Sequence, residues 1–167
     1  MDISDTLAPN SDQLDAIELV GAPRTFTITE VSRHNAEQPV NIHLADFPRV
    51  WRPGKSMRRV LAACWGTDAS AYVGRRVTLY CDESVKFGND VTGGTRISHL
   101  SHIDKRRSIP LIIKRGKSAS FTVEPLADLT PTETLKAEWK SADPERRKAI
   151  EVEVKALTAE LPSGESA

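Results

Sequence analysis

Positively charged and aromatic side chains recur together through the middle of the chain. Cations can follow the phosphates of an unpaired strand and flat rings can stack on its bases, each stack contributing about 1–3 kcal/mol. Any one of these side chains is also consistent with an ordinary exposed cation or a half-buried ring. As a set they predict a binding face for single-stranded nucleic acid, which consists of Trp51, Lys55, Arg58, Arg59, Arg76, Tyr80, Lys86, Phe87, Arg96, Lys105, Arg106, Arg107, Lys114, Arg115 and Lys117.

Two histidines raise the question of a metal site. His99 and His102 are three residues apart, and on a strand this spacing sends the two rings to opposite faces. A structural zinc site needs four ligands in a closed shell, and the sequence contains no CxxC or HExxH motif. We therefore predict no metal and no cofactor, and we expect both histidines to form hydrogen bonds near the binding face.

A short acidic pattern raises the question of catalysis. Asp82 and Glu83, followed by Lys86, are similar to the acidic and lysine residues of metal-dependent nucleases, in which carboxylates bind magnesium. This pattern occurs by chance in many chains, and the sequence lacks the glycine-rich motifs that cradle phosphates. We predict that the protein is not an enzyme, and a divergent metal-dependent nuclease is the less favoured alternative.

The charges are sorted along the chain although they sum to zero. Residues 1–23 contain five acidic residues and no Lys or Arg, residues 24–127 carry a net charge of +8, and residues 128–167 carry −3. A basic middle between acidic ends is typical of a polyanion-binding core whose ends repel the polyanion or compete with it. Chance unevenness on a solvated surface is the alternative interpretation.

The length and composition favour one globular domain with extensions. A chain of 167 residues is long enough for one buried core. No apolar run approaches the roughly 18 residues of a membrane helix, and the N-terminus has no secretory leader pattern. Cys64 and Cys81 fall at apolar positions and are expected to be reduced core thiols. We predict a cytoplasmic protein that does not enter a membrane.

The stretch 74–103 is the centre of the predicted fold. Between Arg76 and Cys81, apolar and polar side chains alternate with the two-residue period of a strand that is buried on one face. The polar face carries Arg76 and Tyr80, a cation beside a ring. After the turn signal Gly93-Gly94 the chain returns with Arg96 in the same alternation. The pattern predicts a long basic-aromatic β-hairpin.

Four more strands and one helix are expected around this hairpin. Runs of β-branched residues and turn signals predict strands, and apolar residues at i, i+3, i+4, i+7 and i+8 predict the helix. Pro110 indicates that its strand begins at a sheet edge. The expected elements are strands at 24–33 and 39–46, a helix that Ser56 caps and Gly66 ends, and two strands within 105–126 that are hinged at 115–117.

The two ends of the chain have different patterns. Residues 1–23 are expected to be an acidic, partly disordered segment with one helical turn that has Leu14 and Ile17 on one face. Residues 128–161 are expected to be a helical hairpin, and 162–167 a disordered tail. The second helix has a narrow apolar stripe that either packs on the β domain or binds a partner, including a second copy of the chain: Ile150, Val154, Leu157 and Leu161.

The order of these elements determines the expected fold class. Strands without alternating β-α units exclude a doubly wound sheet and favour a mainly β domain at 24–127. We expect a small antiparallel barrel of the oligonucleotide-binding (OB) type with one inserted helix. In that fold the helix usually follows the third strand, whereas here it follows the second predicted strand.

Several motifs resemble those of a known group of proteins. The strings WRPGKSMRRVLAACWG, YVGRRVTLYCDESVKFG, GGTRISHLSHI and KRGK look like those of a family of small, largely uncharacterised bacteriophage and prophage proteins. The resemblance covers roughly residues 11–126. It implies a phage protein in the bacterial host's cytoplasm that acts near DNA replication and recombination, and it transfers no catalytic residue.

The leading hypothesis is a single-stranded DNA-binding protein that acts in phage DNA replication or recombination. Its partners would be single-stranded DNA, a second copy through the C-terminal helices, and replication or recombination proteins. The alternative from another class is a phage protein-interaction module, an inhibitor or adaptor of a host protein, in which the basic face meets an acidic protein surface.

Overall fold

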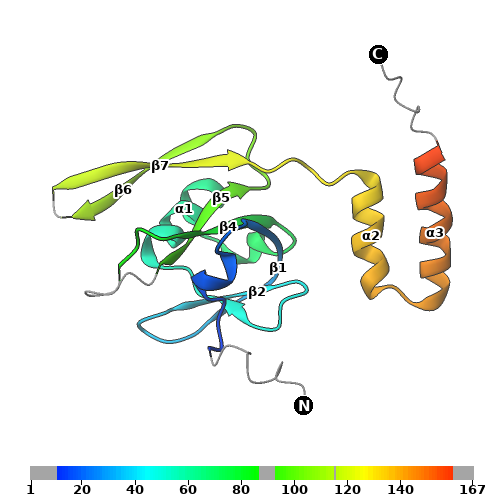
Figure 1. The fold of residues 1–167 in the computed structure, drawn as a ribbon, viewed down its shortest axis with the longest axis horizontal. Helices are drawn as coiled ribbons and strands as arrows, with labels where there is room; N and C mark the ends of the chain where they lie inside the picture. The colour runs from blue at the N-terminus through cyan, green and yellow to red at the C-terminus, as the bar shows by residue number, and fades with distance from the viewer. Residues whose placement is uncertain (1–10, 87–92, 115, 160–167) are drawn as a thin grey trace. The chain divides into compact units, whose positions relative to one another are not determined.

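The computed structural model describes residues 11–86, 93–114 and 116–159, with the backbone alone for 113 and 114. The chain divides into two compact units, with the boundary between Leu126 and Ala127 (Figure 1). The first unit contains η2 (Ala16–Leu19), β1 (Arg24–Arg33), β2 (Val40–Leu44), β3 (Val50–Trp51), α1 (Lys55–Trp65), η3 (Ala69–Tyr72), β4 (Arg76–Asp82), β5 (Gly94–Leu100), β6 (Arg107–Lys114) and β7 (Lys117–Pro125), where η denotes a 3-10 turn. The second contains α2 (Pro131–Ser141) and α3 (Pro144–Ala159).

The first unit is a mixed seven-stranded sheet with the order β3-β2-β1-β4-β5-β7-β6. Most neighbours are antiparallel, but β5 and β7 run parallel where His99 pairs with Glu124. The prediction of a purely antiparallel sheet was therefore wrong at this pair. Within the described residues the sheet is not closed, because β3 and β6 are its two edges. Pro110 lies in the edge strand β6, as predicted.

Strand β1 connects the two halves of the sheet. Its second half pairs with β2, from Ile28 opposite Leu44 to Arg33 opposite Val40. Its first half pairs with β4, where Phe26 lies opposite Val77. The register shifts between Ile28 and Glu30, the irregularity that lets a long strand bend from one partner to the other. The predicted strand at 24–33 has these same bounds.

The predicted helix is α1, and its apolar stripe is buried. Met57, Val60, Leu61 and Trp65 are each at most 7% exposed, and Cys64 is half-buried beside them. The helix begins two residues earlier than predicted, because Gly54 and not Ser56 is the residue that precedes it. Gly66 ends it with a φ of 90°, a left-handed conformation that favours glycine.

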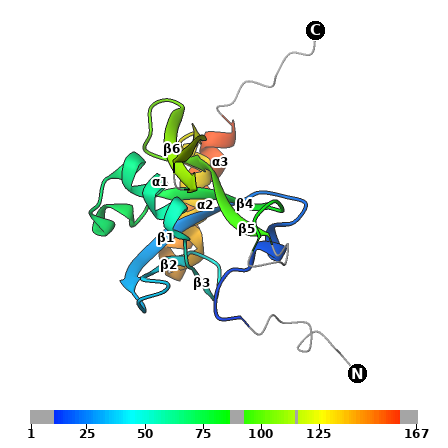
Figure 2. The same cartoon turned by 90° about the vertical axis from the view of Figure 1, so that its left-hand side faces the viewer.

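The N-terminal segment from Ser11 to Leu19 belongs to this core. Leu14 and Leu19 are 4% and 3% exposed, whereas Ile17 is 74% exposed, so the prediction that Leu14 and Ile17 share the buried face was wrong for Ile17. The Leu14 amide donates to the Val50 carbonyl of β3 at 2.8 Å. The turn η2 packs against β4 and β5, as Figure 2 shows in dark blue. The segment therefore contacts both the β3 edge and the central hairpin.

A short strand that was not predicted explains why the helix was expected after the second strand and not after the third. β3 has two residues, Val50 and Trp51, which pair with His43 and Ile42 of β2. Two residues are too few to produce a visible alternation in the sequence. With β3 counted, α1 follows the third strand instead of the second.

The second unit is a helical hairpin that its own side chains hold together. Thr130 and Glu133 form the predicted capping box at the start of α2. Arg146 of α3 donates to Glu138 of α2 at 2.7 Å, and the Arg147 guanidinium lies 4.8 Å from the centre of the Trp139 ring. No helix among the described residues has the length and apolarity needed to cross a membrane.

Candidate nucleic-acid interface

One side of the central hairpin, the β4–β5 outer face, is defined here by Arg76, Thr78 and Tyr80 of β4 and Arg96 and His99 of β5. Their neighbours on the opposite side, Val77, Leu79, Ile97 and Leu100, are fully buried. Tyr80 lies directly opposite Arg96, and Thr78 lies opposite His99. Cross-strand partners share a face and their β-carbons lie about 4.5–5.5 Å apart, so Tyr80 and Arg96 share one face of the hairpin, as predicted.

The environment of Tyr80 and Arg96 is partly desolvated. Both side chains are half-buried, and burial raises the pKa of the Tyr80 hydroxyl. Arg96 lies 3.5 Å from the Asp82 carboxylate. Asp82 also accepts hydrogen bonds from the amide and hydroxyl of Ser84, which lower the pKa of its carboxyl, with a smaller effect from Arg96. Arg96 thus lies opposite Tyr80 in the neighbouring strand, with the Asp82 carboxylate beside its guanidinium.

Hydroxyl and imidazole groups continue the same face. The hydroxyls of Thr25 and Thr78 are 2.7 Å apart, and Ser98 donates to the Thr78 carbonyl. His99 Nδ1 lies 2.9 Å from the Ser98 hydroxyl, and His102 Nδ1 lies 2.8 Å from the Ser101 hydroxyl. The prediction that the histidines form hydrogen bonds is confirmed. His99 and its cross-strand partner Thr78 are close to the Tyr80–Arg96 pair in the β4–β5 ladder.

Trp51 does not contribute a stacking surface. It is 0% exposed, and its indole N–H donates to the Thr95 hydroxyl at 2.9 Å. The prediction that this ring stacks on bases was wrong because Trp51 lies in β3, in the phase that points into the core. Its role is structural, since it links β3 to β5 across the interior.

The remaining predicted cations lie on other elements. On α1, Lys55 and Arg59 are exposed and Arg58 is half-buried with its Nε lacking a hydrogen-bond partner within the described part of the chain. Arg107, at the start of β6, is close enough to α1 to lower the pKa of Cys64, although burial of that thiol has the larger, opposite effect. Arg106 pairs with Glu124 at 2.9 Å. Other exposed cations are Lys86, Lys105 and Lys117.

Several predicted residues cannot be placed on a surface. Phe87, Arg115 and Leu161 lie outside the described residues, and Lys114 is described by its backbone alone. Of the predicted partner stripe, Ile150 is 1% exposed, so the prediction that it contacts a partner was wrong. It packs inside the hairpin, whereas Val154 and Leu157 are half-buried.

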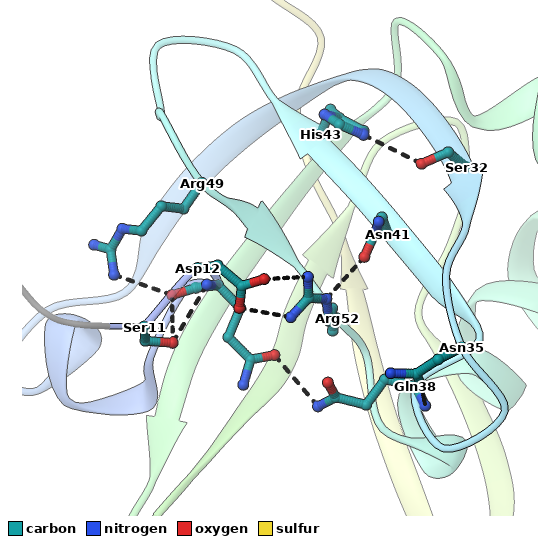
Figure 3. Close-up of polar contacts among 10 residues, drawn as sticks. Ser11, Asp12, Ser32, Asn35, Gln38, Asn41, His43, Arg49 and Arg52 are labelled. Atoms are coloured by element: carbon teal, nitrogen blue, oxygen red, sulfur yellow. Dashed lines mark hydrogen bonds and ion pairs between the residues drawn. The ribbon is translucent and has the colours of Figure 1, made fainter.

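A second basic cluster was missed by the sequence analysis. Figure 3 shows Arg52 between Asp12 and Asn41, with Arg49 nearby and bonded to the same N-terminal segment. Arg52 Nη1 and Nη2 each donate to one Asp12 carboxylate oxygen at 2.7 Å. Arg49 pairs with Glu18. The strand period around Trp51 was the available signal: once Trp51 is assigned to the core, Val50 and Arg52 must point outward.

The acidic pattern at Asp82 and Glu83 belongs to no group of three possible metal ligands within the described part of the chain. In residues 11–86, 93–114 and 116–159, no three His, Cys, Asp or Glu side chains are grouped so that they could hold a metal ion. Asp82 is engaged by Ser84 and Arg96, and Glu83 is exposed. Cys64 and Cys81 are free thiols.

Comparisons with protein-family models, curated proteins and solved structures find no match to the chain.

Proposed function

We propose that the protein binds single-stranded DNA and acts in phage DNA replication or recombination. The observation that carries this proposal is the pairing of Tyr80 with Arg96 across β4 and β5, with Arg76 on the same face. A ring and two cations from separate segments thus lie on one partly exposed surface. The phage setting and the host cytoplasm rest on the resemblance of the sequence motifs.

The element order supports the proposal. We interpret β1 to β5 with α1 as an OB-like arrangement, in which β1 is shared by β2 and β4 and the helix follows the third strand. OB folds are partly open five-stranded barrels that bind oligonucleotides on the face of strands 2 and 3 and with the loops between strands 1 and 2 and between strands 4 and 5. The Trp51–Thr95 hydrogen bond spans β3 and β5, the two strands that such a barrel would bring together.

The chemistry of the face suits an unpaired strand. Tyr80 supplies a flat ring for a base, and Arg76 and Arg96 supply positive charge for phosphates. His99, which is half-buried beside the Ser98 hydroxyl, offers a hydrogen bond that does not depend on base identity. A face of this kind would bind single strands with little sequence preference and with strong salt dependence.

A titration of labelled oligothymidine by fluorescence anisotropy tests the proposal. If five to eight phosphates are neutralised, log affinity should fall with log salt concentration at a slope of about −3.5 to −6. Binding that is undetectable, or that does not change with salt, would contradict the proposal. Cleavage that requires magnesium and is lost in Glu83→Ala would instead indicate the nuclease alternative.

One observation favours a second role, that of self-association through the C-terminal helices. Trp139 is 40% exposed and lines a cavity of about 360 Å³ between α2 and α3, together with Lys136, Ile150, Glu151, Val154 and Lys155. Its lining of lysines and a glutamate around apolar side chains is suited to the same hairpin of a second copy. Sedimentation velocity would show a dimer that Trp139→Ala dissociates; a monomer at all concentrations would exclude this role.

A further inference from the structure

The guanidinium of Arg52, directly after β3, is held in position to bind an anion, and we call its two terminal nitrogens the arginine fork. Arg52 Nε donates to the Asn41 side-chain carbonyl at 2.8 Å, which fixes the plane of the guanidinium. The two terminal nitrogens each donate at 2.7 Å to the carboxylate of Asp12 (Figure 3). The Arg52 side chain is 8% exposed. A buried, pre-oriented guanidinium with two parallel donors is the geometry that binds carboxylate or phosphate.

The carboxylate in this fork lies at the protein surface. The Asp12 side chain is 75% exposed, in contrast to Arg52. The chain becomes anchored one residue later, where Gln13 pairs with Val50 and Leu14 enters the core. Asp12 could therefore leave the fork by side-chain rotation, while Leu14 stays buried. An external anion could take its place without repacking the core.

A second arginine of the same region is neutralised by the same segment. Arg49 pairs with Glu18 and donates to the Gln13 carbonyl at 3.0 Å. Its guanidinium also lies 5.0 Å from the centre of the Phe47 ring. The Asp15 carboxylate lies 3.9 Å from the same guanidinium. Three acids of the N-terminal segment thus pair with two arginines, one on each side of Trp51 in the sequence. Both arginines belong to the basic middle of the chain, and the three acids to its acidic end.

We propose that Arg52 is a second phosphate-binding site for single-stranded DNA, and that Asp12 occupies it as an intramolecular substitute for a phosphate. The inference rests on the proposed function and goes beyond it. It adds a second site directly after β3, which includes no residue of the β4–β5 outer face. It also means that the N-terminal segment competes with DNA for Arg52. The wild-type protein then binds single-stranded DNA more weakly than a protein in which Asp12 does not occupy Arg52.

The test compares two variants that remove the same charge from neighbouring places. Asp12→Asn opens the fork, whereas Glu37→Gln alters the exposed turn next to Gln38, which contacts Gln13. Oligothymidine affinity should rise about fivefold in Asp12→Asn, and the salt slope should steepen by about 0.7, the value for one further phosphate on a single strand. Glu37→Gln should leave the slope unchanged. Thermal melting of each variant verifies that it is folded.

Variants of Arg52 show whether the gain in oligothymidine affinity depends on the Arg52 guanidinium. Adding Arg52→Lys to Asp12→Asn keeps the charge but removes the bidentate geometry, so most of the gain should disappear. Arg52→Lys alone should change affinity little, because Asp12 covers the site in the wild type. A gain that persists in the double variant, or that is equal in Glu37→Gln, would overturn the inference.

The two proposals fail in different ways. If wild-type protein binds oligothymidine and Asp12→Asn binds it with the same affinity and slope, the Arg52 site does not exist and the proposed function stands. If neither the wild type nor Asp12→Asn binds, the proposed function is wrong, and the Arg52 inference is wrong with it.

Discussion

Two aromatic residues of the predicted binding face have opposite environments. Trp51 is fully buried, whereas Tyr80 is half-buried beside Arg96. Strand phase explains the difference, because successive side chains of a strand point to opposite faces. A ring next to cations in the sequence is thus a candidate for base stacking only when the cations share its phase.

Replacement of Tyr80 tests the stacking role. Tyr80→Leu should weaken oligothymidine binding by about 1–3 kcal/mol, the contribution of one base–ring stack, while Tyr80→Phe should retain most of the affinity. Fluorescence anisotropy at fixed salt measures both. Equal affinity of Tyr80→Leu and the wild type would show that no base stacks on this ring.

Replacement of Trp51 tests its structural role. Trp51→Ala should lower the free energy of unfolding by about 3–5 kcal/mol, because it empties a large buried site. Thr95→Val should cost about 1–3 kcal/mol by leaving the buried indole N–H without its acceptor. Urea denaturation measures both changes. A Trp51→Ala protein of unchanged stability with impaired DNA binding would contradict the structural role and indicate that Trp51 contacts DNA.

Elements with a clear period could be predicted from the sequence, and elements without one could not. The strand at 24–33 and the hairpin from Arg76 to Leu100 follow a two-residue alternation, and both are present. β3 is too short to show a period. The parallel pairing of β5 with β7 depends on contacts between distant segments, which no local pattern encodes.

The helical hairpin should be sensitive to acid. The Arg146 hydrogen bond lowers the pKa of Glu138 below its ordinary value of 4.5. A lowered folded-state pKa means that the ion pair stabilises the hairpin above that ordinary value, and that this stabilisation is lost as the pH falls through the lowered pKa. Far-ultraviolet circular dichroism should show less helix in Glu138→Gln than in the wild type at neutral pH.

The same comparison at acid pH is the control for this effect. Once Glu138 is protonated, the wild type and Glu138→Gln carry the same charge at this position, so their helix contents should converge. A difference that is independent of pH would mean that Arg146 stabilises the hairpin by packing and not through its charge.

At the scale of the whole molecule, the sorted charges are brought together by the fold of the first unit. Asp12 and Glu18 of the acidic N-terminal segment lie on Arg52 and Arg49 of the basic middle. The sequence predicted that the acidic ends repel a polyanion or compete with it, but not which cations the acids contact. Those contacts depend on Leu14 and Leu19, which anchor the segment in the core.

The residues that share the proposed binding surface could be predicted only in part. Arg76, Tyr80 and Arg96 share one face because a single hairpin carries them. The cations of α1 and of the segments beside β6 are placed by packing between elements, which the sequence pattern does not determine. Arg49 and Arg52 were missed because their phase is visible only after β3 is recognised.

The most direct test of the account is the oligothymidine affinity of the double variant Arg76→Glu, Arg96→Glu, measured by fluorescence anisotropy beside the wild type at several salt concentrations. We predict that the double variant melts at a temperature close to that of the wild type, binds at least tenfold more weakly at low salt, and has a shallower salt slope, because about two phosphate contacts are lost. Unchanged affinity in a folded double variant would contradict the assignment of the β4–β5 outer face as the DNA-binding surface.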